Sequence, residues 1–147
     1  MPEKSLPWMP FCTSVVVATV LGSITQTQFN LAALQGLGAS IETDVRLQAT
    51  LHDLIGFSPT LAALVLVAFL VAIPLTSWIA PYLGIWRWPA FLLAGAAAVW
   101  LALATANSLA PMPTLIAADR TLAGTLALMA CGGCGALAFT WLRGSGR

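Results

Sequence analysis

A run of polar side chains interrupts the first apolar stretch of this 147-residue chain, in the segment GSITQTQFN at residues 22–30. Gln26 and Asn30 share a helical face with Gly22, because residues four apart lie on the same side of a helix. Their amide groups both donate and accept hydrogen bonds, which suits the recognition of carbonyl and hydroxyl groups. Unpaired amides are costly in an apolar environment, so we expect these side chains to face a polar pocket or to bond neighbouring helices.

Charged and titratable residues are predicted to gather near this polar stretch. Arg46, His52 and Asp53 follow it in the sequence, and Asp119 and Arg120 directly precede the last apolar segment. An arginine can bind phosphate or carboxylate through its guanidinium, and a histidine exchanges protons near neutral pH. A carboxylate before a helix is also favoured by the helix dipole, so Asp119 is consistent with a helix cap as well. The predicted ligand-binding residues are Gln26, Gln28, Asn30, Arg46, His52, Asp53, Asp119 and Arg120.

A C-x-x-C motif at residues 131–134 is an alternative source of chemistry. Such a pair supports thiol–disulfide exchange when a low-pKa thiol is accessible, and it resembles the motif of four-helix membrane thiol oxidoreductases linked to quinones. Those proteins also carry a second cysteine pair that relays electrons, whereas the remaining cysteine here, Cys12, is expected on the opposite side of the membrane. Small residues let membrane helices approach closely. Cys131 and Cys134 are therefore interpreted first as packing residues and second as a redox pair.

No catalytic residue and no metal site is predicted. The sequence has one histidine and three cysteines, and it contains no Walker loop, no G-x-S-x-G and no H-E-x-x-H motif. We expect no obligate cofactor, although a quinone or a lipid would suit the polar pocket. A net charge of +1 gives no electrostatic reason to expect nucleic acid as a partner.

The composition places these residues in a membrane protein whose first partner is the lipid bilayer. The chain is 59% hydrophobic and 7% charged, against about 25% charged residues in soluble domains. A transmembrane helix needs about 20 apolar residues to cross about 30 Å of hydrocarbon. Four segments meet this requirement: residues 11–34, 59–79, 89–109 and 121–142.

The connection between the first two segments is long enough to hold a further helix, predicted over residues 43–55. Apolar residues recur on one of its faces: Leu47, Leu51, Leu54 and Ile55. Polar residues line another: Arg46, Thr50 and Asp53. We expect a short amphipathic helix with an apolar underside, acting as a solvated lid or as a cap over a pocket. Ser58 and Pro59 then provide an N-cap and a first-turn proline for the second segment.

The predicted fold class is all-α, an integral membrane four-helix bundle with this additional amphipathic helix between transmembrane helices 1 and 2, in a single domain over residues 1–147. Small residues on the third and fourth transmembrane segments favour close helix packing. The third segment carries Ala90, Ala94, Ala98, Ala102 and Ala106 at four-residue spacing. The fourth carries two neighbouring rows that make up its stripe, one of Ala127, Cys131 and Gly135 and the other of Gly132 and Ala136. These stripes would pack against each other or serve a homo-oligomer or another chain of a membrane complex.

Basic residues and tryptophans indicate the orientation, because lysine and arginine favour the cytoplasmic side and indoles favour the interface. One side is expected to hold Lys4, Arg87, Arg143 and Arg147, together with Trp8, Trp78, Trp86, Trp88 and Trp141. We expect a bacterial inner-membrane protein with both termini cytoplasmic. The predicted function is a non-enzymatic accessory or lipid/quinone-type binding protein with a polar pocket in the outer leaflet. The alternatives are a thiol–disulfide/quinone oxidoreductase and a structural subunit of a larger complex.

Overall fold

The computed structural model describes residues 7–82, 86–110 and 116–144. Its long helices are α1 (Trp8–Gly36), α3 (Ser58–Ile79), α4 (Arg87–Leu109) and α5 (Leu122–Gly144), with α2 (Thr43–Gly56) and the short 3-10 helix η1 (Ala117–Arg120) between them. No strand occurs within the described ranges. The all-α four-helix fold is confirmed. Each boundary of the five α-helices lies within three residues of its prediction, whereas the short η1 was not predicted.

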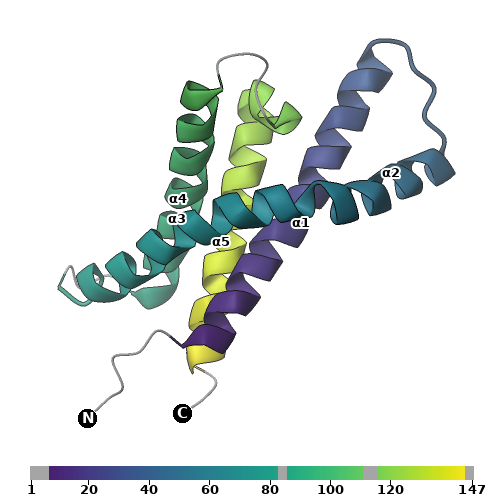
Figure 1. The fold of residues 1–147 in the computed structure, drawn as a ribbon. Helices are drawn as coiled ribbons and strands as arrows, with labels where there is room; N and C mark the ends of the chain where they lie inside the picture. Colours follow the sequence, from purple (N-terminus) through teal and green to yellow (C-terminus); the bar gives the residue numbers. More distant parts are fainter. Residues whose placement is uncertain (1–6, 83–85, 111–115, 145–147) are drawn as a thin grey trace.

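The four long helices are each long and apolar enough to cross a membrane, so the chain is a multi-pass membrane protein. They form a ring in which α5 packs between α1 and α4, while α3 packs against α4 and α1. We call the end where α1 begins and α5 ends the proximal end, and the opposite end the distal end. Figure 1 shows α4 and α5 side by side, whereas α3 runs obliquely across the bundle.

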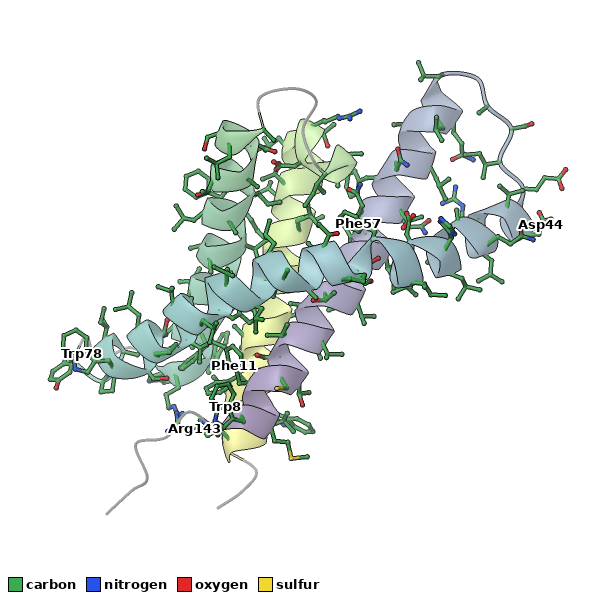
Figure 2. The ribbon with its side chains drawn as sticks, in the orientation of Figure 1. Trp8, Phe11, Asp44, Phe57, Trp78 and Arg143 are labelled. Atoms are coloured by element: carbon green, nitrogen blue, oxygen red, sulfur yellow. The ribbon has the colours of Figure 1, made fainter. Side chains whose placement is uncertain are left out.

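The oblique course of α3 begins in α2, because the two helices form one nearly continuous rod (Figure 1). Only Phe57 separates them, and its backbone stays in the right-handed helical region, with φ −91° and ψ −32°. Its N–H donates to the Asp53 carbonyl at 2.8 Å, which continues the helical hydrogen-bond pattern across the junction. Figure 2 shows Phe57 where this rod crosses α1, with Asp44 at the far end of α2.

The expected Ser58 cap is wrong. The N-cap position of α3 is Phe57, and no side chain caps the helix there. The Ser58 hydroxyl is buried without a hydrogen-bond partner among the described residues. A capping serine normally sits in extended backbone. Here the chain never leaves the helical region between α2 and α3, so the backbone N–H groups at the start of α3 keep helical acceptors.

Glycines bring α5 into direct contact with both of its neighbours. A Cβ on Gly95 of α4 would overlap the backbone oxygen of Gly132, and a Cβ on Gly132 would overlap Val99. A Cβ on Gly135 would lie 2.6 Å from the Cβ of Ala18 on α1. Small residues permit such close approach between membrane helices. The predicted small-residue stripe of α5 therefore serves two helices, with Gly132 facing α4 and Gly135 facing α1.

Candidate functional site

The polar half of α1 is covered by α2. Asp53 on α2 accepts a hydrogen bond from the buried Thr27 hydroxyl at 2.7 Å. Gln28 donates to Thr50 Oγ1 at 3.1 Å, and its own Oε1 accepts from Arg46 Nη1 at 2.7 Å. The second guanidinium nitrogen of Arg46 donates to Gln35 Oε1 at 3.0 Å. We call this set the α1–α2 clamp; its members are Thr27, Gln28, Gln35, Arg46, Thr50 and Asp53.

The clamp turns the polar face of α2 inward, and this overturns the expected apolar underside. The apolar residues of α2 point away from α1: Leu47 is 61% exposed, Leu51 53% and Ile55 80%. The physical reason lies in the surroundings of a membrane protein. Leucine and isoleucine can face lipid without loss, whereas amide, carboxylate and hydroxyl groups near the hydrocarbon need hydrogen-bond partners inside the protein.

Gln26 bonds a different element, the 3-10 helix η1. Its side chain is buried, and its Oε1 accepts a hydrogen bond from the backbone N–H of Ala118 at 2.7 Å. Ala118 belongs to η1 in the connection from α4 to α5, and it is almost fully buried. An unpaired buried N–H group costs about 1–3 kcal/mol. Gln26 therefore anchors this connection on α1 and does not join the clamp.

Asp119 ties the end of α4 to the start of α5. One carboxylate oxygen accepts from the Asn107 side-chain amide, and the other accepts from the Thr125 hydroxyl at 2.8 Å. The backbone N–H of Gly124 donates to Thr121 Oγ1 at 3.1 Å, so Thr121 supplies the side-chain cap of α5. The capping role suggested for Asp119 is therefore taken by Thr121, whereas Asp119 bonds side chains of α4 and α5.

Three further predicted residues lie at the surface. Asn30 on α1 and His52 on α2 are exposed, and Arg120 is exposed at the end of η1. The structure thus brings together Gln28, Arg46 and Asp53, places Gln26 and Asp119 at the neighbouring connection, and leaves Asn30, His52 and Arg120 on the surface. Thr27, Gln35 and Asn107 were not predicted, although Thr27 stands in the polar run itself.

The two cysteines of the C-x-x-C motif meet different surroundings. Cys131 is half-buried, with its sulfur 3.3 Å from the Thr25 hydroxyl on α1. Cys134 is exposed and lines a hollow between α4 and α5. The sulfurs are free, and so is that of Cys12, which is exposed near the start of α1. Cys131 therefore takes part in the α1–α5 contact, whereas Cys134 faces outward.

An apolar groove runs between α3 and α4, with a volume of about 640 Å³. We call it the α3–α4 groove. Its α4 wall includes Ala94, Ala98, Ala102 and Ala106, and its α3 wall includes Leu64, Val67, Val71 and Leu75. Four of the five alanines predicted to pack against a neighbouring helix thus line an open groove. The contact of α4 with α5 uses Gly95 and Val99 in their place.

Two hydroxyl groups lie in the groove, and both are already paired. Thr76 donates to the Ala72 carbonyl and Thr105 donates to the Leu101 carbonyl, each at 2.7 Å within its own helix. The groove therefore offers its occupant an almost purely hydrocarbon surface. No family model matches the chain, and comparisons with curated proteins and with solved structures give no match. Function is inferred from this geometry alone.

Proposed function

We propose that this protein is a non-enzymatic membrane protein that holds one extended hydrocarbon chain, of a lipid or an isoprenoid quinone, in the α3–α4 groove. The observation that carries the proposal is the apolar lining of a groove whose hydroxyl groups are satisfied within their own helices. A polar ligand would lose hydrogen bonds to water on entering such a surface. A hydrocarbon chain would lose none.

The dimensions of the groove favour a chain over a helix. The α4 residues that line it run from Ala94 to Leu109, which spans about 23 Å at a rise of about 1.5 Å per residue. Spread over that length, even the whole empty volume of the groove, about 1,270 Å³, gives a mean cross-section of only about 55 Å². A helix with a diameter of about 10 Å occupies about 80 Å². A partner helix would lie across the mouth of the groove, while a single chain fits within it.

The α1–α2 clamp lies outside the groove and supports this function indirectly, by setting the direction of α3. Asp53 lies one turn before α3 on the same continuous rod, and Thr27 fixes it to α1. The direction of α3, and with it the width of the groove, follows from this attachment. In the proposal, Thr27, Gln28, Arg46 and Asp53 position α3 and do not contact the bound chain.

We further propose that the distal end faces the periplasm of a bacterial inner membrane, with both termini in the cytoplasm. Each of the four acidic residues within the described ranges lies at the distal end: Glu42, Asp44, Asp53 and Asp119. Arg87 and Arg143 lie at the proximal end, and Arg46 and Arg120 lie at the distal end. In the sequence, Lys4 precedes α1 and Arg147 follows α5. Counted with the helices they flank, four of the six basic residues belong to the proximal side, the side that the positive-inside rule assigns to the cytoplasm. Reporter fusions after Gly144 and in the α1–α2 loop would test this orientation, and activity of a periplasmic reporter after Gly144 would contradict it.

A pair of tryptophan substitutions on one helix tests the groove. Ala102 lines it, whereas Ala104, two residues further along α4, is exposed outside it. Native mass spectrometry of protein purified in mild detergent should show a bound lipid or quinone on the wild type and on Ala104→Trp, and its loss from Ala102→Trp. Equal retention by both variants would contradict the proposal. The mass of the retained species would name the ligand.

One observation favours a second candidate, a subunit of a larger membrane complex. The exposed apolar residues Leu47, Leu51 and Ile55 form a stripe along α2, and an exposed apolar stripe is typical of a protein or membrane interface. Site-specific crosslinking from position 51 in native membranes distinguishes the candidates. A crosslink to one defined protein would favour the complex subunit, and crosslinks to lipid alone would favour the lipid-binding protein.

A further inference from the structure

A second hollow lies between the start of α4 and the end of α5, at the proximal end, with a volume of about 1,010 Å³. It is separate from the α3–α4 groove, since none of its lining residues is shared with that groove. Its rim carries Arg87, Trp88 and Trp141, and its floor includes Cys134 and Ala138. We call it the α4–α5 hollow.

Small side chains on α5 keep this hollow open. Cys134, Ala138 and Gly144 line it where larger residues would fill it. Three of its lining residues, Arg87, Trp88 and Trp141, are exposed. The hollow is therefore a recess on the surface and not a void in the core.

The rim and the floor of the hollow differ in chemistry. Arginine and tryptophan side chains are hydrogen-bond donors and not acceptors, so Arg87, Trp88 and Trp141 suit a group rich in acceptors. Among the described residues that line the hollow, none is acidic. The floor of Cys134, Leu137 and Ala138 is apolar. An occupant that satisfies both parts is an amphiphile with an anionic head and a hydrocarbon tail.

The charge distribution of the bundle favours the same occupant. Within the described ranges, the proximal end holds Arg87 and Arg143, whereas the distal end holds four acidic residues and two arginines, Arg46 and Arg120. The proximal end is therefore the positively charged one. Arg143 is held 5.9 Å from the centre of the Phe139 ring, and Figure 2 shows it at the proximal end, near Trp8. Arg87 is the one basic residue among the described residues that line the hollow. Basic pockets between transmembrane helices bind anionic lipid headgroups.

We propose that the α4–α5 hollow binds the headgroup of an anionic phospholipid, with the phosphate beside Arg87, the indoles of Trp88 and Trp141 flanking it, and one acyl chain along Cys134 and Ala138. A guanidinium binds phosphate through two parallel hydrogen bonds, and indoles favour the headgroup level of a bilayer. This site is independent of the chain-binding groove, and its occupant is a charged lipid and not a neutral one.

The test compares two lipids with identical chains, dioleoyl phosphatidylglycerol and dioleoyl phosphatidylcholine, added to the detergent-purified full chain. Native mass spectrometry should show half-occupancy by phosphatidylglycerol at a concentration about tenfold lower than by phosphatidylcholine. Arg87→Gln should abolish this preference. Arg120→Gln removes the same charge at the distal end and should preserve it. Ala102→Trp should preserve it too, which separates this site from the groove.

A second readout needs no variant. Cys134 lines the hollow and Cys12 lies outside it, and both are exposed. Phosphatidylglycerol should slow alkylation of Cys134 by N-ethylmaleimide several-fold more than phosphatidylcholine does, with the rate at Cys12 equal for the two lipids. Equal protection by both lipids, or a preference that survives Arg87→Gln, would overturn the proposal. Protection of Cys134 by inorganic phosphate alone would assign the hollow to a free anion and would also overturn it.

Discussion

Helix α4 carries small residues on two of its faces, and the two faces have opposite outcomes. On one face, Gly95 meets Gly132 so closely that neither position has room for a Cβ. On the other face, Ala94, Ala102 and Ala106 line an open groove. The same kind of residue on the same helix therefore closes one contact and leaves another open.

The neighbouring helix explains the difference. α5 places the small residues Gly132 and Ala136 against Gly95, and it runs alongside α4 (Figure 1). Across the groove from the alanines, α3 carries larger side chains such as Leu64 and Val71. Its continuity with α2 holds α3 at an oblique angle to the rest of the bundle. A small-residue stripe permits close packing, but the partner's side chains and direction decide whether close packing occurs.

Enlarging the closed contact should have the largest effect on stability. Gly132→Val forces a side chain into Val99 and the backbone oxygen of Gly95, and overpacking of this kind costs about 1–3 kcal/mol or more. We expect a clear loss of the free energy of unfolding, measured by denaturation in detergent. Ala130→Val enlarges an exposed position of the same helix and should stay within about 0.5 kcal/mol of the wild type. Equal effects would contradict the closeness of the α4–α5 contact.

Removing one hydroxyl from the clamp should have the next largest effect. Thr27→Val leaves the Asp53 carboxylate without its 2.7 Å donor, and a hydrogen bond to a charged group contributes about 1.5–3 kcal/mol. Because Asp53 is only half-buried, we expect the lower part of that range.

The control for the clamp is Thr13→Val, which removes an α1 hydroxyl that bonds the Met9 carbonyl of its own helix. It should cost much less than Thr27→Val. In a double-mutant cycle, Thr27→Val and Asp53→Asn should be non-additive, as expected for groups in direct contact. Additive losses would show that the two side chains do not act together.

Enlarging the open face of α4 should change stability little. Ala102→Leu adds volume in the α3–α4 groove, so we expect a free energy of unfolding within about 0.5 kcal/mol of the wild type. The same variant should retain less co-purified lipid than the wild type. A destabilisation as large as that of Gly132→Val would show that the groove is closed in the folded protein.

The smallest effect is expected from Cys131→Ala combined with Cys134→Ala. The Thr25–Cys131 contact is long and weak at 3.3 Å, and Cys134 is exposed and lies outside the α3–α4 groove, so stability and lipid retention in that groove should both be nearly unchanged. In the wild type, N-ethylmaleimide should label Cys134 faster than Cys131. Loss of a quinone-linked thiol oxidation activity in the double variant would instead support the redox alternative.

The helices could be predicted because their lengths and ends are local properties. Four apolar segments of membrane-spanning length, with the prolines and glycines between them, located the four long helices, and the spacing within residues 43–55 located α2. The single turn of η1 carries no such pattern and was not predicted. The direction in which α2 turns its polar face could not be predicted from that spacing. It depends on whether the apolar face meets water or lipid, and on the hydrogen-bond partners that Thr27 and Gln28 of α1 require.

Most of the residues that form the site could be predicted from the sequence, but their hydrogen-bond partners could not. Gln28, Arg46 and Asp53 were expected to lie near one another, and they do. The partner of Gln26 is a backbone group 92 residues further along the chain, and no local pattern indicates such a pairing. The groove escaped prediction because an alanine stripe alone does not specify the size of the side chains facing it.

The central claim is that the α3–α4 groove holds one hydrocarbon chain, and its most direct test is electron spin resonance of a chain-labelled neutral lipid in nanodiscs. The spectrum of the wild type should contain a motionally restricted component that corresponds to about one lipid chain per protein above the general boundary lipid. That component should disappear in Ala102→Trp and persist in Ala104→Trp. An equal restricted fraction in the wild type and both variants would contradict the claim.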